Sequence, residues 1–330
     1  MTAKPETHLM QCLEVWGGNQ AVDSGVIMAG VDAWLFSQPY QGDDRGGDVH
    51  FVSSCATGRL TRMLVADVSG HGNAVADTAA ALRRVMRRYM NHIDQRRFVE
   101  VLNAEFAALA RAGHFATTVA ATYYAPTREL AICTAGHPPP LRYSVSSKSW
   151  SVLRDNCDKG GGDPHVPSNI PLGIVDLGSY EQQKLRLNVG DLVLLYTDSL
   201  IESRDEEGRL LGVEGLVRIA QTIDLVDPGE FIDELMQRIR APYPSNLSTD
   251  DVTALLFRPN SLAPRVPLGT RLRAQWLMLK ELFKYLIRHK EPMPWPEVSV
   301  ANIGGAFSDT LARATPGMKA EAQVENTATK

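Results

Sequence analysis

The sequence has few cysteines, and none of them lies close to another. Four occur in 330 residues, at Cys12, Cys55, Cys133 and Cys157, and no two form a CxxC pair. Disulfide-rich secreted domains and zinc modules need closely spaced cysteines, so the pattern excludes both classes and indicates reduced thiols. The first residues also lack the charged-then-apolar order of a secretory signal. We therefore expect a cytoplasmic protein.

Long hydrophobic runs and a basic stripe are missing as well. No uninterrupted apolar stretch approaches the roughly 18 residues of a membrane-spanning helix, so we expect no membrane insertion. Residues 261–330 hold 10 Lys and Arg against 6 Asp and Glu, whereas the first 260 residues hold 24 against 32. The body therefore carries a net charge of −8 and the tail +4. An acidic body is unlike a nucleic-acid-binding protein, and we expect no nucleic-acid partner.

Two common catalytic signatures are absent. The chain has neither a GxSxG elbow for a serine nucleophile nor a cysteine nucleophile signature. The three glycines at 160–162 lie in a Gly/Pro/Asn-rich stretch, residues 155–171, and no GK[ST] follows them. This stretch is predicted to be a surface flap and not a phosphate-binding loop.

What the sequence does contain is the pattern of a mixed α+β protein. Apolar residues at helical spacing predict two consecutive helices, over 75–89 and over 98–109 with Asp94 as cap, and a third that begins at Asp227 and Pro228. Because strands follow the helix pair as a group, we expect antiparallel sheets with helices packed outside. Runs rich in β-branched and aromatic residues predict strands at 31–37, 63–68, 115–124, 130–135, 183–188, 191–198 and 251–257.

Several aspartates stand at the margins of these strands. Asp48 lies in RGGDV, Asp67 ends MLVAD, Asp198 ends LVLLYTD, and Asp250 and Asp251 open DDVTALLF. A carboxylate at the rim of a sheet is costly unless it is paired or bound to a cation, and several together can hold hard divalent ions. A turn or a helix cap explains any one of them alone. With four aspartates at strand margins, a metal site is as good an interpretation as four unrelated turns or caps.

The order of the motifs resembles that of a known enzyme family. RGGD, DVSGHG, FATTVAATYY, AGHPPPL, PLGI, LLYTDSLIE and TDDVTALLF follow one another between Gly46 and Phe257. This series is similar to the metal-dependent Ser/Thr protein phosphatase (PPM) family, and most of all to its bacterial SpoIIE-like branch. The resemblance implies an α+β fold with a central antiparallel β-sandwich flanked by helix pairs, in αββα layers. It also implies two Mn²⁺ or Mg²⁺ ions and the removal of phosphate from phosphoserine or phosphothreonine in a phosphoprotein. In such signalling systems the substrate is expected to be a small phosphoserine regulator.

The resemblance assigns roles to individual residues. Asp67 is expected to bridge both ions, with the carbonyl of Val68 as a second ligand from the same turn. Asp48 is the expected ligand of the second ion, and Asp198 and Asp250 are those of the first. Catalysis would then depend on Asp67, Asp48 and Asp198 through a metal-activated water. The glycines of DVSGHG would allow the tight turn beside the ions, with His71 either next to the site or simply at the helix start, and His137 structural.

Two positions depart from the family pattern. Ser199 stands where the family has glycine after the metal-binding aspartate, and Phe51 replaces the second aspartate of GGDYYD. If that glycine has positive φ, serine is expected to cost about 1 kcal/mol of strain and to weaken metal binding. The alternative to an active enzyme is therefore a degenerate phosphatase fold that serves as a phosphoprotein-binding module. The four retained aspartates favour the enzyme.

The sequence also suggests a division of the chain. Residues 1–260 are predicted to form the phosphatase domain, with its motif core at 46–257 and residues 1–45 as edge strands. The helices near 73–90 and 96–111 would act as its control element, as the resemblance also suggests. Residues 261–330 are predicted to form a linker, an amphipathic helix and a disordered tail. The stripe of this helix either packs on the body or forms a partner or homo-oligomer contact, through Leu272, Trp276, Leu279, Phe283, Leu286 and Ile287.

Overall fold

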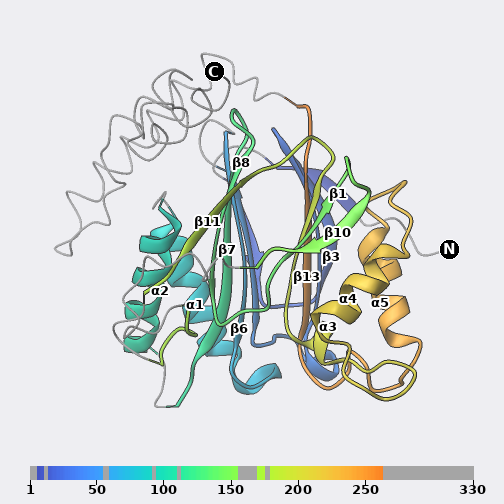
Figure 1. Ribbon diagram of the computed structural model, residues 1–330. Helices are drawn as coiled ribbons and strands as arrows, with labels where there is room; N and C mark the ends of the chain where they lie inside the picture. The colour runs from blue at the N-terminus through green and yellow to red at the C-terminus, as the bar shows by residue number, and fades with distance from the viewer. Residues whose placement is uncertain are drawn as a thin grey trace. The chain divides into compact units, whose positions relative to one another are not determined.

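Two β-sheets face each other at the centre of the fold (Figure 1). The computed structural model describes residues 6–10, 14–54, 59–90, 94–109, 113–154, 169–174 and 179–262, which all belong to one compact unit. The predicted C-terminal linker, helix and tail, and most of the predicted flap, lie outside the described residues. Within the described part, no helix has both the length and the apolar character needed to span a bilayer.

The first sheet has seven strands in the order β1-β3-β4-β13-β12-β9-β10. Their pairings are antiparallel except for β1 with β3. The strands are β1 (Glu6–Leu9), β3 (Val22–Met28), β4 (Val31–Gln38), β9 (Leu141–Ser144), β10 (Ser149–Val152), β12 (Leu192–Tyr196) and β13 (Val252–Pro259).

The second sheet has six antiparallel strands in the order β11-β8-β7-β6-β5-β2. The strands are β2 (Val15–Gly18), β5 (Asp48–Ser54), β6 (Leu60–Val68), β7 (Ala116–Tyr124), β8 (Glu129–Ala135) and β11 (Gln182–Arg186). The predicted antiparallel sandwich is therefore confirmed. All seven predicted strands are present. Of the N-terminal strands, β1 and β2 lie at sheet edges as predicted, whereas β3 and β4 lie inside the first sheet.

Helices cover the outer faces of both sheets (Figure 1). On the six-stranded sheet lie α1 (Ala76–Tyr89) and α2 (Gln95–Leu109), and the predicted cap of α2 is confirmed by a bond from the Arg97 amide to the Asp94 carboxylate. On the seven-stranded sheet lie α4 (Gly212–Gln221) and α5 (Phe231–Arg240), with the short α3 (Ser199–Glu202) before them. The α5 helix begins three residues after the predicted Pro228, because residues 228–230 form a turn. Two 3₁₀ turns complete the fold, η1 (Tyr40–Gly42) and η2 (Gly72–Ala74).

Strand β6 shows why the apolar runs are continuous. Its Met63 and Val65 face the other sheet, whereas Leu64, Ala66 and Val68 face α1 and α2. Both faces of the strand are thus buried, so the run MLVA needs no polar alternation. The core consists of three layers in this way: one between the sheets, and one under each helix pair.

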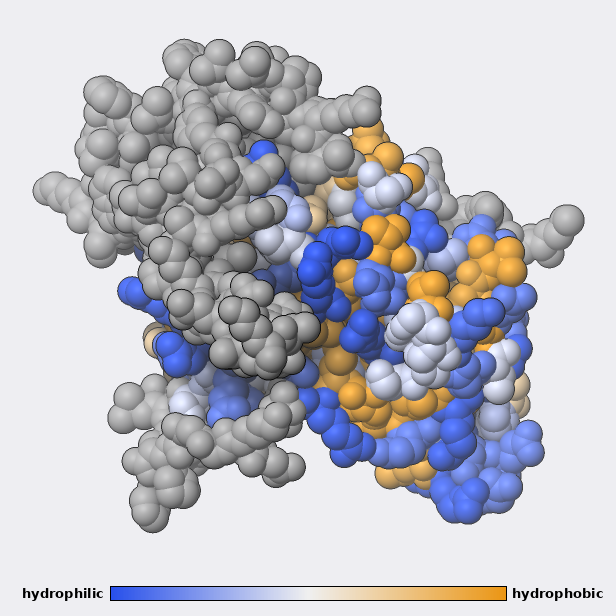
Figure 2. All heavy atoms as spheres, turned by 45° about the horizontal axis from the view of Figure 1, so that its top comes forward, coloured by the Kyte–Doolittle hydropathy of each residue, from blue (hydrophilic) through white to orange (hydrophobic). Residues whose placement is uncertain are grey.

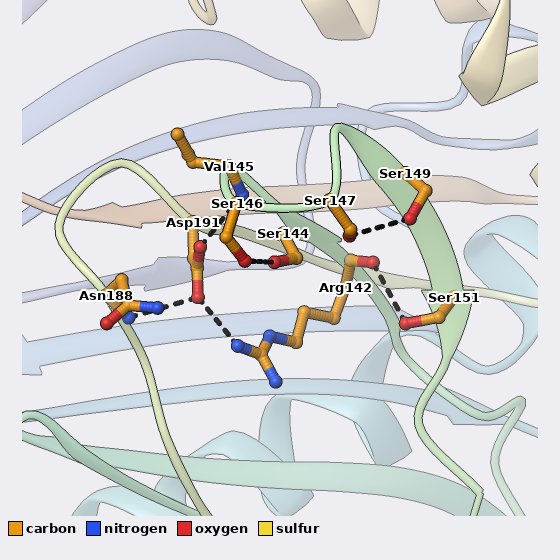
Figure 3. Close-up of polar contacts among 9 residues, drawn as sticks. All are labelled: Arg142, Ser144, Val145, Ser146, Ser147, Ser149, Ser151, Asn188 and Asp191. Carbon is orange, nitrogen blue, oxygen red and sulfur yellow. Dashed lines mark hydrogen bonds and ion pairs between the residues drawn. The ribbon is translucent and has the colours of Figure 1, made fainter.

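A buried aspartate fixes the turns at one end of the seven-stranded sheet (Figure 3). Asp191 is fully buried and accepts hydrogen bonds from the backbone amides of Val145 and Asn188. Its carboxylate also lies 2.8 Å from the Arg142 guanidinium. The ion pair and the two amide bonds tie the β9–β10 turn to the segment before β12. This gives β12 a fixed starting point, and β12 delivers Asp198 at its far end.

Candidate metal centre

The predicted acidic residues meet at one end of the two sheets. Asp48 begins β5 and stands directly opposite Asp67 of β6 in the antiparallel register. Asp198 follows β12 and Asp250 precedes β13, which are neighbouring strands of the other sheet. Each carboxylate therefore lies at the margin of a central strand, as expected from the sequence. Two come from each sheet.

The charges of these residues act on one another. Burial, followed by the charges of Asp198 and Asp250, raises the pKa of Asp67 to about 8. Burial, followed by the charge of Asp67, raises the pKa of Asp48 well above its usual range. The pKa of Asp250 is raised to about 6, again mainly by burial. Such shifts mean that the ionised carboxylates lack enough positive charge nearby, and a bound cation would supply it.

The acidic side chains of the cluster act on one another from a distance. Among the described residues, no three acidic, histidine or cysteine side chains close on a common point that could hold an ion. Coulombic coupling acts over longer distances than metal ligation, so this finding is compatible with the shifted pKa values. The residues offer the type of ligand that divalent ions need, because Mg²⁺ and Mn²⁺ prefer carboxylate and carbonyl oxygens.

The turn after Asp67 explains the glycines around it. Gly70 and Gly72 have φ values of +101° and +63°, in the region that favours glycine. A Cβ on Gly47 would lie 3.0 Å from the Val68 carbonyl oxygen and 3.1 Å from that of Gly70. The bare backbone of RGGD therefore packs directly against the DVSGHG turn. This close approach keeps Asp48 and the Val68 carbonyl together.

Asp251 has a role that the sequence analysis missed. It is 2 % exposed, and its carboxylate accepts hydrogen bonds from the backbone amides of Tyr40, Gly47 and Gly72 at 2.7, 2.7 and 3.0 Å. One side chain thus ties η1, the RGGD segment and the DVSGHG turn to the start of β13. The sequence signal was the second aspartate of DDVT, whose partners are all distant backbone groups.

Two threonines orient Asp48 and were also missed. The Thr197 hydroxyl donates to the Asp48 carboxylate at 2.9 Å, and Thr197 in turn accepts from the Thr253 amide at 2.9 Å. Hydrogen bonds from Thr253 and Thr197 oppose the rise in the pKa of Asp48. The sequence contained the signal, because Thr197 lies in YTD and Thr253 lies in DDVT, each close to an aspartate predicted at a strand end. These bonds hold the Asp48 carboxylate of the six-stranded sheet toward the seven-stranded sheet.

The two departures from the family pattern prove harmless in the fold. Ser199 is the first residue of α3 and its φ is not positive, so the expectation of backbone strain at this residue is wrong. The preceding Asp198 is itself helical, with φ −63°, and the chain enters α3 without a left-handed step. Phe51 is buried among the residues between the six-stranded sheet and α1 and α2. It is a core residue, and the loss of the second aspartate there opens no gap.

The two histidines lie in different environments. His71 is exposed, its ring centroid is 4.1 Å from that of Tyr40, and its charge contributes to lowering the pKa of Asp250. It therefore lies beside the carboxylate cluster. His137 is buried, and its Nδ1 is 2.8 Å from the Thr117 hydroxyl. Burial lowers the pKa of His137 to about 3, so its ring is neutral, as suits a structural residue.

Comparisons with known proteins agree with this architecture. The sequence profile described as Stage II sporulation protein E (SpoIIE) matches residues 57–260, a range that includes Asp67, Asp198 and Asp250. The fold is similar to the RsbU and RsbW domains of Rv1364c from Mycobacterium tuberculosis, with a TM-score of 0.58 and 23% identity over 78% of this chain and 71% of that one. It is also similar to the PP2C phosphatase domain of SpoIIE from Bacillus subtilis with a fragment of its regulatory domain (TM-score 0.54, 14% identity, 76% and 64% of the two chains). RsbX in complex with magnesium has the same fold (TM-score 0.51, 15% identity, 72% and 100%).

Proposed function

The chain belongs to the SpoIIE family of PP2C-type phosphatases, and from this premise we propose that it is a metal-dependent phosphoprotein phosphatase. Its substrate would carry phosphoserine or phosphothreonine, as in a small phosphorylated regulator of bacterial signalling. The observation that carries the proposal is the gathering of Asp48, Asp67, Asp198 and Asp250 at one end of the sandwich, with the pKa of Asp67 raised to about 8. A site this short of positive charge suits divalent cations.

The same residues would hold the ions. Oxygen ligands would come from both sheets, namely from Asp67, the carbonyl of Val68, Asp48, Asp198 and Asp250. When bound, Mn²⁺ or Mg²⁺ would activate a water and neutralise charge on the phosphoryl oxygens.

The protein contributes positioning. The Thr197 hydroxyl holds the Asp48 carboxylate in place. The Asp251 carboxylate fixes η1, the RGGD segment and the DVSGHG turn through one backbone amide of each. His71 is exposed and lies close enough to Asp250 to act on it electrostatically. No serine or cysteine nucleophile is needed, because the attacking group is water.

The alternative, a degenerate module that binds phosphoproteins without hydrolysing them, rested on Ser199. That argument required a strained backbone at Ser199, and the backbone there is helical. We therefore retain the enzyme as the proposal.

Hydrolysis of p-nitrophenyl phosphate and of a phosphoserine peptide tests the proposal directly. We expect turnover with Mn²⁺ or Mg²⁺ and none with EDTA. Hydrolysis that persists in EDTA, or none of either substrate at any metal concentration, would refute it.

A further inference from the structure

We infer that two exposed apolar side chains, Phe115 and Ile174, form a rim that contacts the residues flanking the phosphoserine of the substrate protein. The inference rests on the proposed function and adds a substrate preference to it. The rim would favour a phosphoserine with an aliphatic or aromatic neighbour.

The backbone of Phe115 is fixed to the turn of the candidate metal centre. The Ser69 amide donates to the Phe115 carbonyl at 2.9 Å, and the Phe115 amide donates to the Ser69 hydroxyl at 3.1 Å. Ser69 follows Asp67 by two residues in the DVSGHG turn. Phe115 therefore borders the place where a phosphate group would have to arrive.

The strand register sets the direction of the Phe115 side chain. Thr117 of β7 stands opposite Asp67 of β6, and Ala116 is buried toward α1 and α2. Side chains alternate along a strand, and the paired segment continues to Phe115 through its bonds to Ser69. Phe115 thus lies on the same face as Thr117 and Asp67. It is 39% exposed there.

The PLGI segment, which ends in Ile174, runs beside the residues that flank Phe115. Leu172 and Ala116 exchange two backbone hydrogen bonds, at 3.0 and 2.7 Å, and the Gly173 amide donates to the Asn103 side chain at 2.8 Å. A Cβ on Gly173 would lie 3.3 Å from the His114 carbonyl oxygen, so the segment runs close to the residue before Phe115. Ile174 follows at once and is 53% exposed.

Exposed apolar residues are common on this protein, and position distinguishes these two. On the side drawn in Figure 2, hydrophobic and hydrophilic residues are interspersed over the described surface, which is ordinary for a folded protein. Phe115 differs because its backbone is bonded to Ser69 of the acidic turn, and Ile174 differs because it directly follows a bonded segment that runs beside Phe115. A backbone that is already fixed lowers the cost of ordering a contact surface on binding.

The occupant must be a protein segment and not a small phosphate ester. A phosphoserine that reaches the carboxylate cluster brings its neighbouring residues over the rim, where an apolar neighbour would leave water. The rim therefore selects for an apolar flank.

Three substrates and three variants test the inference. The substrates are p-nitrophenyl phosphate and two phosphoserine peptides that differ only in the flanking residues, leucine in one and serine in the other. The variants are Phe115→Ser, Ile174→Ser and, as a matched control, Val226→Ser. Val226 is 87% exposed and lies between α4 and α5, which cover the other sheet. Peptide affinity is measured in parallel by fluorescence anisotropy with non-hydrolysable phosphonate analogues.

We expect the wild type to prefer the leucine-flanked peptide. Phe115→Ser and Ile174→Ser should lower kcat/KM and affinity for that peptide by about fivefold or more, with p-nitrophenyl phosphate turnover unchanged. Val226→Ser should change neither. Equal loss toward all three substrates, or no preference between the peptides, overturns the inference. Absence of turnover of all three substrates in the wild type refutes the proposed function instead, and the affinities of the two analogues still decide whether the rim exists.

Discussion

At the scale of single residues, Asp67 is ionised at a high energetic cost in the metal-free protein. Its pKa is raised to about 8, whereas an aspartate in the unfolded chain titrates near 3.8. The folded state thus binds the proton more tightly than the unfolded state does. The stabilisation from this group is complete below about pH 4 and is lost as the pH rises through about 8. Metal binding would remove the same repulsion at neutral pH.

The substitution Asp67→Asn separates charge from size. We expect phosphatase activity to fall at least about 100-fold, because the bridging charge is lost. In the metal-free protein at pH 8, the variant should melt at least about 3 °C higher than the wild type, since the repulsion is gone. Asp77→Asn is the control, because the Asp77 side chain is 94% exposed on α1. Near wild-type turnover of Asp67→Asn in saturating Mn²⁺ contradicts the assignment.

Asp250 and Asp251 are neighbours, but we expect their substitution to affect activity and stability in opposite ways. Asp250→Asn should abolish metal-dependent activity and leave the melting temperature of the metal-free protein unchanged or raised. Asp251→Asn should lower the free energy of unfolding by about 2–3 kcal/mol, because the asparagine NH₂ group cannot accept a hydrogen bond from a backbone amide as the replaced carboxylate oxygen does. Thermal melts and Mn²⁺ titrations of both variants check this. Equal stability of the two variants would contradict the role of Asp251.

Ser199 provides a test of the corrected backbone. A helical Ser199 has no strain to relieve, so Ser199→Gly should leave the Mn²⁺ concentration for half-maximal activity within about twofold of the wild type. Glycine in the first turn of α3 should reduce stability by about 0.5–1 kcal/mol. A several-fold gain in apparent Mn²⁺ affinity, measured in chelator-buffered assays, would show that the residue is strained after all.

At the scale of elements, α1 begins at the candidate metal centre. Val75 precedes the helix, and its methyl groups lie 2.8 Å from a Cβ placed on Gly47 and 2.9 Å from one placed on Gly70. A shift of α1 would therefore press on both segments that carry the ligands. We propose that α1 and α2 form the control element of the enzyme, with two packing arrangements that a partner could bias.

The buried stripe of α1 tests this proposal. Val85 is 5% exposed in the core between α1, α2 and the sheet. Val85→Ala should raise the Mn²⁺ concentration for half-maximal activity by about threefold, because looser packing displaces the helix start. Leu216→Ala in the buried core of α4 is the control for destabilisation alone. If both variants change only the melting temperature, the stripe is merely core.

Elements differ in how well the sequence predicts them. Strands such as β6 and β12 are predictable, because burial on both faces makes them continuous apolar runs. Strand β5 was not predicted: its sequence DVHFVSS is fully buried, yet it carries an aspartate, a histidine and two serines that hide the pattern. The short strands β9 and β10 give too few residues for a period to show.

At the scale of the whole molecule, the carboxylates were predictable and their support was not. Each aspartate ends or begins an apolar strand, and strands of a sandwich bring their margins together. The partners of Asp251 are three backbone amides from distant segments, which no local pattern encodes. The strain assigned to Ser199 came from the family pattern, and the local backbone decided otherwise.

We propose above all that residues of both sheets bind a pair of divalent ions at the carboxylate cluster. Isothermal titration calorimetry of the metal-free chain with Mn²⁺ measures this binding without any substrate. We predict saturable binding of two ions per chain in the wild type, and fewer or much weaker sites in Asp67→Asn. The account would be contradicted if the wild type bound no Mn²⁺, or if Asp67→Asn bound it with the same stoichiometry and affinity.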